Sequence, residues 1–142
     1  MDYREQAKEL LRRRRNLLSA QTAIEEELTL LEREREVCSK RIDESQDGDE
    51  TYIDRLIGVL ADLDDCRFRK SIVERELLKL RRGLDGLDDY QRDLLISFYS
   101  ECGHATAEEV MDKWFKERST VYRDKQIALD RFTRSVYGVL QI

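Results

Sequence analysis

The side chains with the most chemistry to offer lie together in one stretch near the end of the chain. Their spacing of i, i+1, i+4, i+5 and i+8 places them on one face of a helix. The residues of this face are Arg118, Ser119, Tyr122, Arg123 and Gln126. Arg can donate to guanine O6 and N7, Gln can pair with adenine N6 and N7, and hydroxyl groups can contact phosphate. The pattern therefore predicts a helix that recognises the major groove of double-stranded DNA.

The opposite face of the same stretch is apolar and is expected to pack inward. It consists of Val121, Ala128, Leu129, Phe132 and Val136, which should meet Val110, Met111 and Trp114. Residues 116–134 carry six basic and three acidic side chains, a net charge of +3 in a chain whose net charge is −5. Such a local excess is typical of site-specific DNA binding. It adds Lys116, Lys125 and Arg131 as candidates for contacts to the DNA backbone.

Short helices must hold this face in place. The sequence predicts helices at residues 88–100, 106–115 and 118–137. Thr106 and Glu109 have capping-box spacing, and the Asp88-Asp89 pair suits a helix N-terminus. Because the link between the last two helices is so short, they must cross sharply, as in a helix-turn-helix. The side chains at this link, Trp114 and Phe115, are expected in the core.

Other kinds of chemistry have little support. The cysteines Cys38, Cys66 and Cys102 are odd in number and lack C-x-x-C spacing, which favours reduced thiols over a disulfide framework or a zinc site. The single histidine, His104, lies beside Cys102, but no second histidine or acidic cluster is spaced to join it. The sequence has no phosphate-binding glycine loop, nucleophile elbow or zincin motif. We therefore expect no enzymatic activity, no metal and no cofactor.

The first half of the chain has the pattern of a coiled coil. One seven-residue track consists of Tyr3, Leu10, Leu17, Ile24, Leu31 and Cys38, beside Ala7, Arg14, Gln21, Leu28, Arg35 and Ile42. A second consists of Tyr52, Val59, Cys66, Val73, Leu80 and Leu87, beside Leu56, Leu63, Lys70, Leu77 and Leu84. Heptads predict long helices that supercoil on a partner, and the polar segment 43–50 predicts a loop. We expect a long antiparallel helical hairpin at 1–86, followed by the helix-turn-helix module at 87–142.

Three further features concern the ends and the outer surface of this hairpin. Gly83 and Gly86 should end or kink its second helix. Leu11 and Leu18 lie off the main seam and are candidates for dimerisation along the outer face. The four arginines at 12–15 suit a solvated helix surface, and contact with phosphate or an acidic partner is the alternative.

Composition limits the class of protein. The 142 residues include no proline and only six glycines, which are too few turn formers for a β-sheet protein. No stretch approaches the roughly 20 apolar residues of a membrane span, and the start lacks the apolar core of a signal peptide. These features predict an all-α, soluble, cytoplasmic protein with no membrane partner. The net charge of −5 predicts weak non-specific binding to DNA.

Residues 87–140 resemble a known family. The resemblance rests on Glu109-Val110-Met111, Trp114, Arg118-Ser119-Thr120-Val121-Tyr122-Arg123, Ala128-Leu129, Phe132 and Tyr137-Gly138. These residues resemble the helix-turn-helix of sigma-factor region 4, and more closely the ArpU-like and RinA-like late transcription activators of bacteriophages. The resemblance implies a DNA-binding transcription regulator in a bacterial host cell, adds Thr120 to the DNA-binding candidates and makes RNA polymerase a candidate partner. Two positions depart from region 4, because Phe115 replaces the usual turn glycine and Glu117 the usual Ser or Thr cap.

Two other classes of protein remain open. A phage packaging protein of the small-terminase kind also joins a DNA-binding helix-turn-helix to helical oligomerisation elements. A coiled-coil adaptor would bind proteins through the hairpin and would not bind DNA. A small three-helix domain with a charged last helix is also compatible with a purely protein-binding role.

Overall fold

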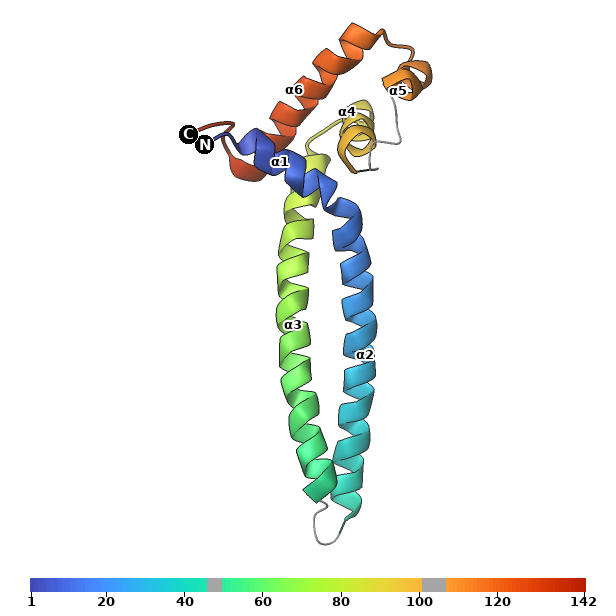
Figure 1. Cartoon of the computed structure of the whole chain (residues 1–142), viewed down its shortest axis with the longest axis vertical. Coiled ribbons are helices and arrows are strands. Elements are labelled where there is room, and N and C mark those ends of the chain that lie inside the picture. Colours follow the sequence, from blue (N-terminus) through green and yellow to red (C-terminus); the bar gives the residue numbers. More distant parts are fainter. Residues whose placement is uncertain (46–49, 101–106) are drawn as a thin grey trace. The chain divides into compact units, whose positions relative to one another are not determined.

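All regular structure in the computed structural model is helical among the residues it describes, 1–45, 50–100 and 107–142 (Figure 1). The helices are α1 (Tyr3–Arg12), α2 (Arg14–Glu44), α3 (Glu50–Asp85), α4 (Asp89–Leu95), the π-helical turn η1 (Ile96–Ser100), α5 (Ala107–Trp114) and α6 (Arg118–Tyr137). The predicted all-α class is confirmed. No helix of this described part is long and apolar enough to cross a membrane.

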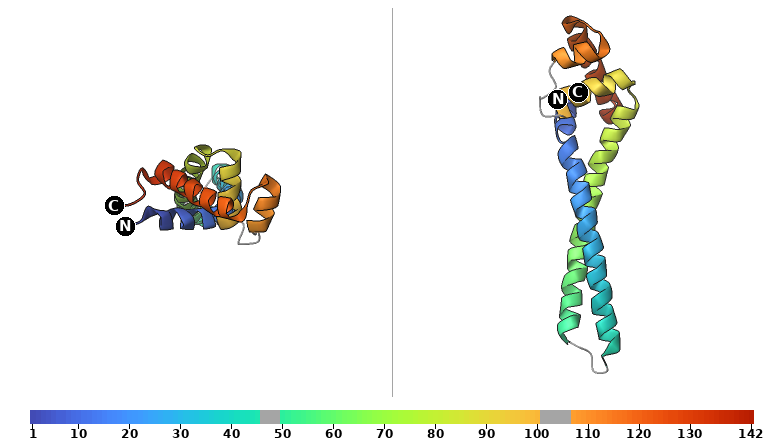
Figure 2. Two further views of the ribbon diagram at one scale, coloured as in Figure 1. Left: turned by 90° about the horizontal axis from the view of Figure 1, so that it is seen from above. Right: turned by 90° about the vertical axis from the view of Figure 1, so that its right-hand side faces the viewer.

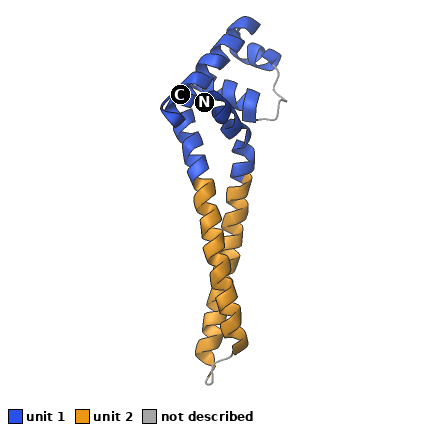
Figure 3. Ribbon diagram, turned by 60° about the vertical axis from the view of Figure 1, so that its left-hand side comes forward, with its two compact units in different colours: residues 1–18, 75–142 blue, residues 19–74 orange. Residues whose placement is uncertain are grey.

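The chain forms two compact units (Figure 3). Unit 1 contains residues 1–18 and 75–142, and unit 2 contains residues 19–74. This division differs from the expected boundary at residue 86. The first helix and the last turns of α3 belong with the C-terminal helices because α6 packs against α1 and lies close to the backbone of α3.

In unit 2, segments of α2 and α3 lie antiparallel and side by side (Figures 1 and 2). Ion pairs join Glu27 to Arg69 at 3.0 Å and Glu34 to Arg55 at 2.9 Å. Later residues of α2 therefore pair with earlier residues of α3, as antiparallel helices require. The heptad tracks supply the buried side chains between them, as predicted. These are Ile24, Cys38, Val59, Leu63 and Cys66, and both of these cysteines are free thiols.

In unit 1, the expected continuous first helix is broken. Helix α1 ends at Arg12, and Arg13 has φ −81° and ψ −7° at the break before α2. Helix α1 packs on α6, where Arg4 Nε donates to Asp130 Oδ1 at 2.8 Å. The assignment of the first heptad to the hairpin seam was therefore wrong. Leu11, expected on an outer dimerisation face, is fully buried in this unit.

The predicted end of the second helix near Gly83 and Gly86 is confirmed, because α3 ends at Asp85, directly before Gly86. Gly83 itself lies inside α3. A Cβ atom at Gly83 would lie 2.5 Å from Phe132 Cε2 and 2.7 Å from Val136 Cγ2. The absence of a side chain therefore lets α6 approach the backbone of α3 closely.

The three predicted short helices agree with α4 plus η1, α5 and α6 in their bounds. Asp88 caps α4 in a capping box with Gln91, which confirms the predicted cap. The proposed capping box at Thr106, and the Cys102-Gly103-His104 segment, lie outside the described residues.

Candidate nucleic-acid interface

A small apolar cluster fixes α6 against α4 and α5. Leu94, Val110 and Val121 are its buried centre, one from each helix. Phe98, Met111 and Trp114 pack around them among other partly buried side chains. The buried positions of α6 are Val121, Ala128, Leu129, Phe132, Thr133 and Val136, and they include all five apolar residues predicted to face inward. The helix is therefore anchored along one side.

The connection between α5 and α6 is a tight turn with a left-handed residue at its centre. Phe115 has φ +54°, and Lys116 N donates to Met111 O at 3.1 Å across the turn. This is the geometry of a Schellman helix end, in which glycine usually occupies the left-handed position. Phe115 is 93% exposed, so its expected core position was wrong, whereas Trp114 is partly buried. Glu117 precedes α6 as its N-cap, with extended backbone and no hydrogen bond from its side chain to the helix end.

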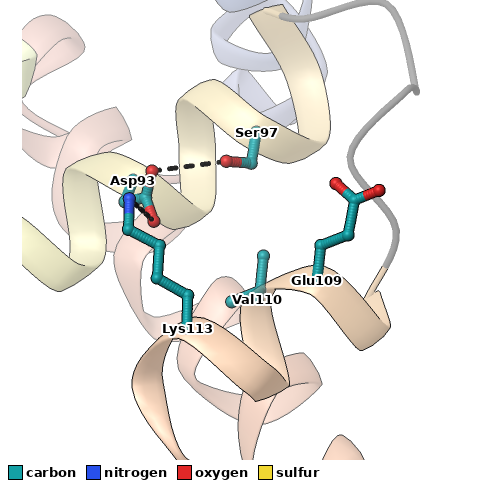
Figure 4. A pocket seen from close by; sticks show the side chains of 5 residues that line it. All are labelled: Asp93, Ser97, Glu109, Val110 and Lys113. Carbon is teal, nitrogen blue, oxygen red and sulfur yellow. Dashed lines mark hydrogen bonds and ion pairs between the residues drawn. The ribbon is translucent and has the colours of Figure 1, made fainter.

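Asp93 of α4 holds α5 in place (Figure 4). Its Oδ2 accepts a hydrogen bond from Trp114 Nε1 at 2.6 Å and lies 3.2 Å from Lys113 Nζ. Ser97 Oγ donates to Asp93 Oδ1 at 3.4 Å, at the edge of a cavity of about 210 Å³. Burial raises the pKa of Asp93, but the hydrogen bonds from Trp114 and Lys113 outweigh burial and hold it below its ordinary value.

Tyr90 joins α4 to both other helices. Its hydroxyl donates to Asp124 Oδ2 of α6 at 2.9 Å, and its ring lies 5.2 Å from that of Trp114. Burial and the hydrogen bond to Asp124 raise the pKa of Tyr90 to about 12. Tyr90 therefore stays neutral at physiological pH. It is one of the positioning residues that sequence reasoning missed, since only the tertiary fold brings residues 90 and 124 together.

The polar face predicted on α6 is exposed. Arg118, Ser119, Tyr122, Arg123 and Gln126 all have exposed side chains, and Thr120 is half-buried. Arg118 lies 4.0 Å from Glu108, and Arg123 lies 3.7 Å from Asp124. Their side chains are 62% and 70% exposed, and exposed pairs of this kind contribute about 0–1 kcal/mol. Both guanidinium groups can therefore exchange these partners for a ligand at little cost.

The three candidates for backbone contacts differ in their surroundings. Lys116 is exposed, with its Nζ 5.5 Å from the centre of the Tyr90 ring. Lys125 is half-buried, its Nζ 4.8 Å from the Phe98 ring and 4.9 Å from the Tyr122 ring, and burial lowers its pKa. Arg131 donates to Gln91 Oε1 at 3.1 Å and to Gly86 O at 3.3 Å. Lys125 is therefore enclosed by aromatic rings, whereas Arg131 and Lys116 are exposed and Arg131 links α6 to α4 through Gln91.

Replacing Asp93 by Asn should lower the free energy of unfolding by about 1–2 kcal/mol at neutral pH, because the ion pair with Lys113 is lost and the acceptor for Trp114 is weakened. A depressed carboxyl pKa stabilises the fold above the unfolded value, about pH 4, and this stabilisation disappears as the pH falls through the folded pKa. Urea unfolding of both proteins between pH 7 and pH 3 should show their difference shrinking in acid. Asp112→Asn, at an exposed position of α5, is the control, and a difference that stays constant with pH would contradict this role for Asp93.

Within the described ranges, no three His, Cys, Asp or Glu side chains gather as metal ligands. The Phe115 turn, like the Asp93 network, was not recognised from the sequence, although the replacement of a turn glycine by Phe115 was a visible signal of an unusual turn. No protein-family model, curated protein or solved structure matches this chain.

Proposed function

We propose that this chain is a sequence-specific double-stranded DNA-binding protein that regulates transcription. In this proposal α5 and α6 are a helix-turn-helix, and the N-terminal half of α6 enters the major groove. The observation that carries it is the combination of an exposed row of Arg118, Ser119, Tyr122 and Arg123 with a buried apolar side on the same helix. A helix that is fixed along one side and carries exposed polar side chains on the other suits the recognition of base edges.

Electrostatics support a site-specific contact. The +3 charge of residues 116–134 attracts phosphate locally, whereas the net charge of −5 opposes indiscriminate coating of DNA. The free N–H groups at the start of α6 favour an anion, and Ser119 adds a hydroxyl donor. Glu117 at the same end repels phosphate, so contacts to the DNA backbone are expected from Lys116 and Arg118 rather than from the cap itself.

The role in transcription rests on the resemblance to the ArpU-like and RinA-like phage activators. RNA polymerase is a candidate partner for this role. The residues of the resemblance include both the packed positions Val110, Val121 and Leu129 and the exposed positions Arg118 and Arg123. The resemblance therefore extends over the anchoring and the recognition sides of α6.

Selection of duplexes from a random pool by the full-length chain tests this function. We expect enrichment of a defined sequence. Fluorescence anisotropy should show that the logarithm of the binding constant falls linearly with the logarithm of the salt concentration. Enrichment of no sequence, together with the absence of salt-dependent binding to any duplex, would contradict the proposal.

A second candidate function is protein binding through unit 2. Ile53, Ile57 and Leu60 have spacing i, i+4 and i+7 on α3, and all three are exposed. An apolar row of this kind suits a second copy of the chain or another helix.

Sedimentation of the full-length chain distinguishes the classes of protein: a monomer or dimer favours the regulator, and a large ring favours a packaging protein. Stable capture of a protein without DNA binding would favour an adaptor.

A further inference from the structure

Phe115 combines two properties that are each unfavourable in a folded protein. Its backbone is left-handed, with φ +54°, which is an outlier for a bulky side chain. Its ring is 93% exposed, so it contributes almost no buried surface to the fold. Glycine or asparagine would satisfy the Schellman turn without either disadvantage. Neither the turn nor the described core therefore accounts for an aromatic side chain at this position.

The surroundings of Phe115 are rich in exposed cations. Lys116 follows it directly, Lys113 lies two residues before it, and Arg118 is in the first turn of α6. Lys113 is 63% exposed although it pairs with Asp93, and Arg118 is 62% exposed beside Glu108. An exposed ring close in sequence to exposed cations is suited to a ligand that offers apolar groups and phosphates close together. Duplex DNA has this chemistry along the rim of its grooves.

We infer that Phe115 is a DNA-contacting residue, whose ring packs on apolar groups at the rim of the groove that α6 enters. This inference rests on the proposed function and deepens it. The turn immediately precedes the end of α6 that points into the groove, so it lies against the sugar–phosphate edge in that arrangement. The apolar groups within its reach there are deoxyribose rings and thymine methyl groups. Lys116 contacts a neighbouring phosphate.

Phe115→Gly and Phe115→Asn separate this contact from a structural role. Both variants relieve the left-handed strain, so the midpoint of thermal unfolding should rise by about 2–4 °C. Affinity for a duplex selected by the wild-type chain should nevertheless fall about tenfold, as expected when an apolar contact is lost. A purely structural residue would not move stability and affinity in opposite directions.

The salt dependence provides a second, independent readout. Because Phe115 carries no charge, the slope of log affinity against log salt concentration should be the same for the wild type and Phe115→Gly. Lys116→Ala is the matched control at the adjacent exposed position, and it should reduce that slope by about one. An altered slope for Phe115→Gly would show that the turn has shifted the cations and would overturn a direct contact by the ring.

Replacing thymidine by deoxyuridine in the selected duplex distinguishes the two apolar groups. If the ring contacts a methyl group, replacement of one thymidine should lower the affinity of the wild type for the duplex but not that of Phe115→Gly. If the ring contacts deoxyribose, no thymidine replacement should lower the affinity of the wild type more than that of Phe115→Gly. Unchanged affinity of Phe115→Gly for the duplex would overturn this inference and leave the proposed function standing. Failure of the wild-type chain to bind any duplex would overturn the proposed function as well.

Discussion

Replacing Arg118 and Arg123 together by alanine should lower affinity for a selected duplex by about 30-fold or more. Each base-contacting arginine contributes about 1–3 kcal/mol, and each 1.4 kcal/mol corresponds to a factor of ten. Both guanidinium groups lie on the exposed side of α6, in surface ion pairs of 4.0 Å and 3.7 Å. Their removal should leave the helix folded, because the buried side that anchors it is untouched. Anisotropy titrations at fixed salt measure the effect, and circular dichroism checks the fold.

The single variants carry further information about specificity. If Arg118 or Arg123 contacts a base edge, its replacement should relax the preference at one position of the site when selection is repeated. Arg134→Ala is the control, because Arg134 is exposed in the last turn of α6, on the same side as Arg123 but about 16 Å further along the helix axis. An equal loss for Arg134→Ala would indicate that only overall charge matters. Unchanged binding of the double variant would show that α6 is not the recognition helix.

Local periodicity was enough to identify most helices and both sides of α6. The positions that recur with helical spacing, such as Val121, Ala128 and Leu129, are buried, and those on the other side, such as Arg118 and Arg123, are exposed. The second heptad track is likewise buried at Val59, Leu63 and Cys66 in unit 2 and at Leu77 and Leu80 in unit 1. Periodicity works in these cases because one side of a helix faces its neighbours along its whole length.

Periodicity could not show which neighbour buries each turn. Tyr3, Ala7 and Leu10 continue the heptad track, yet in the folded chain they belong to α1, which packs on α6. The contacts that redirect them join distant residues: Arg4 pairs with Asp130, and Ser100 Oγ donates to Leu11 O. A pattern of apolar residues specifies that a stripe is buried but not the surface that covers it. This is why the break at Arg13 was not predicted.

Glycines are ambiguous for the same reason. Gly83 and Gly58 both lie inside α3, where an isolated glycine lowers helix stability relative to alanine. Only the tertiary structure distinguishes them, because a Cβ atom at Gly83 would meet Phe132 and Val136, whereas one at Gly58 would meet nothing within 4 Å. Sequence rules alone treated Gly83, like Gly86, as a signal that the helix ends or kinks.

Gly83→Ala should therefore lower the free energy of unfolding by about 1–3 kcal/mol, despite the better helix propensity of alanine. The added Cβ atom would lie 2.5 Å from Phe132 Cε2, and the Phe132 side chain is fully buried, so relief requires movement of packed groups. Gly58→Ala, the matched change in the same helix, should instead raise stability by up to about 1 kcal/mol. Urea unfolding followed by circular dichroism measures both. An increase in stability for both variants would contradict the close approach of α6 to α3, because helix propensity would then be the only effect acting at Gly83.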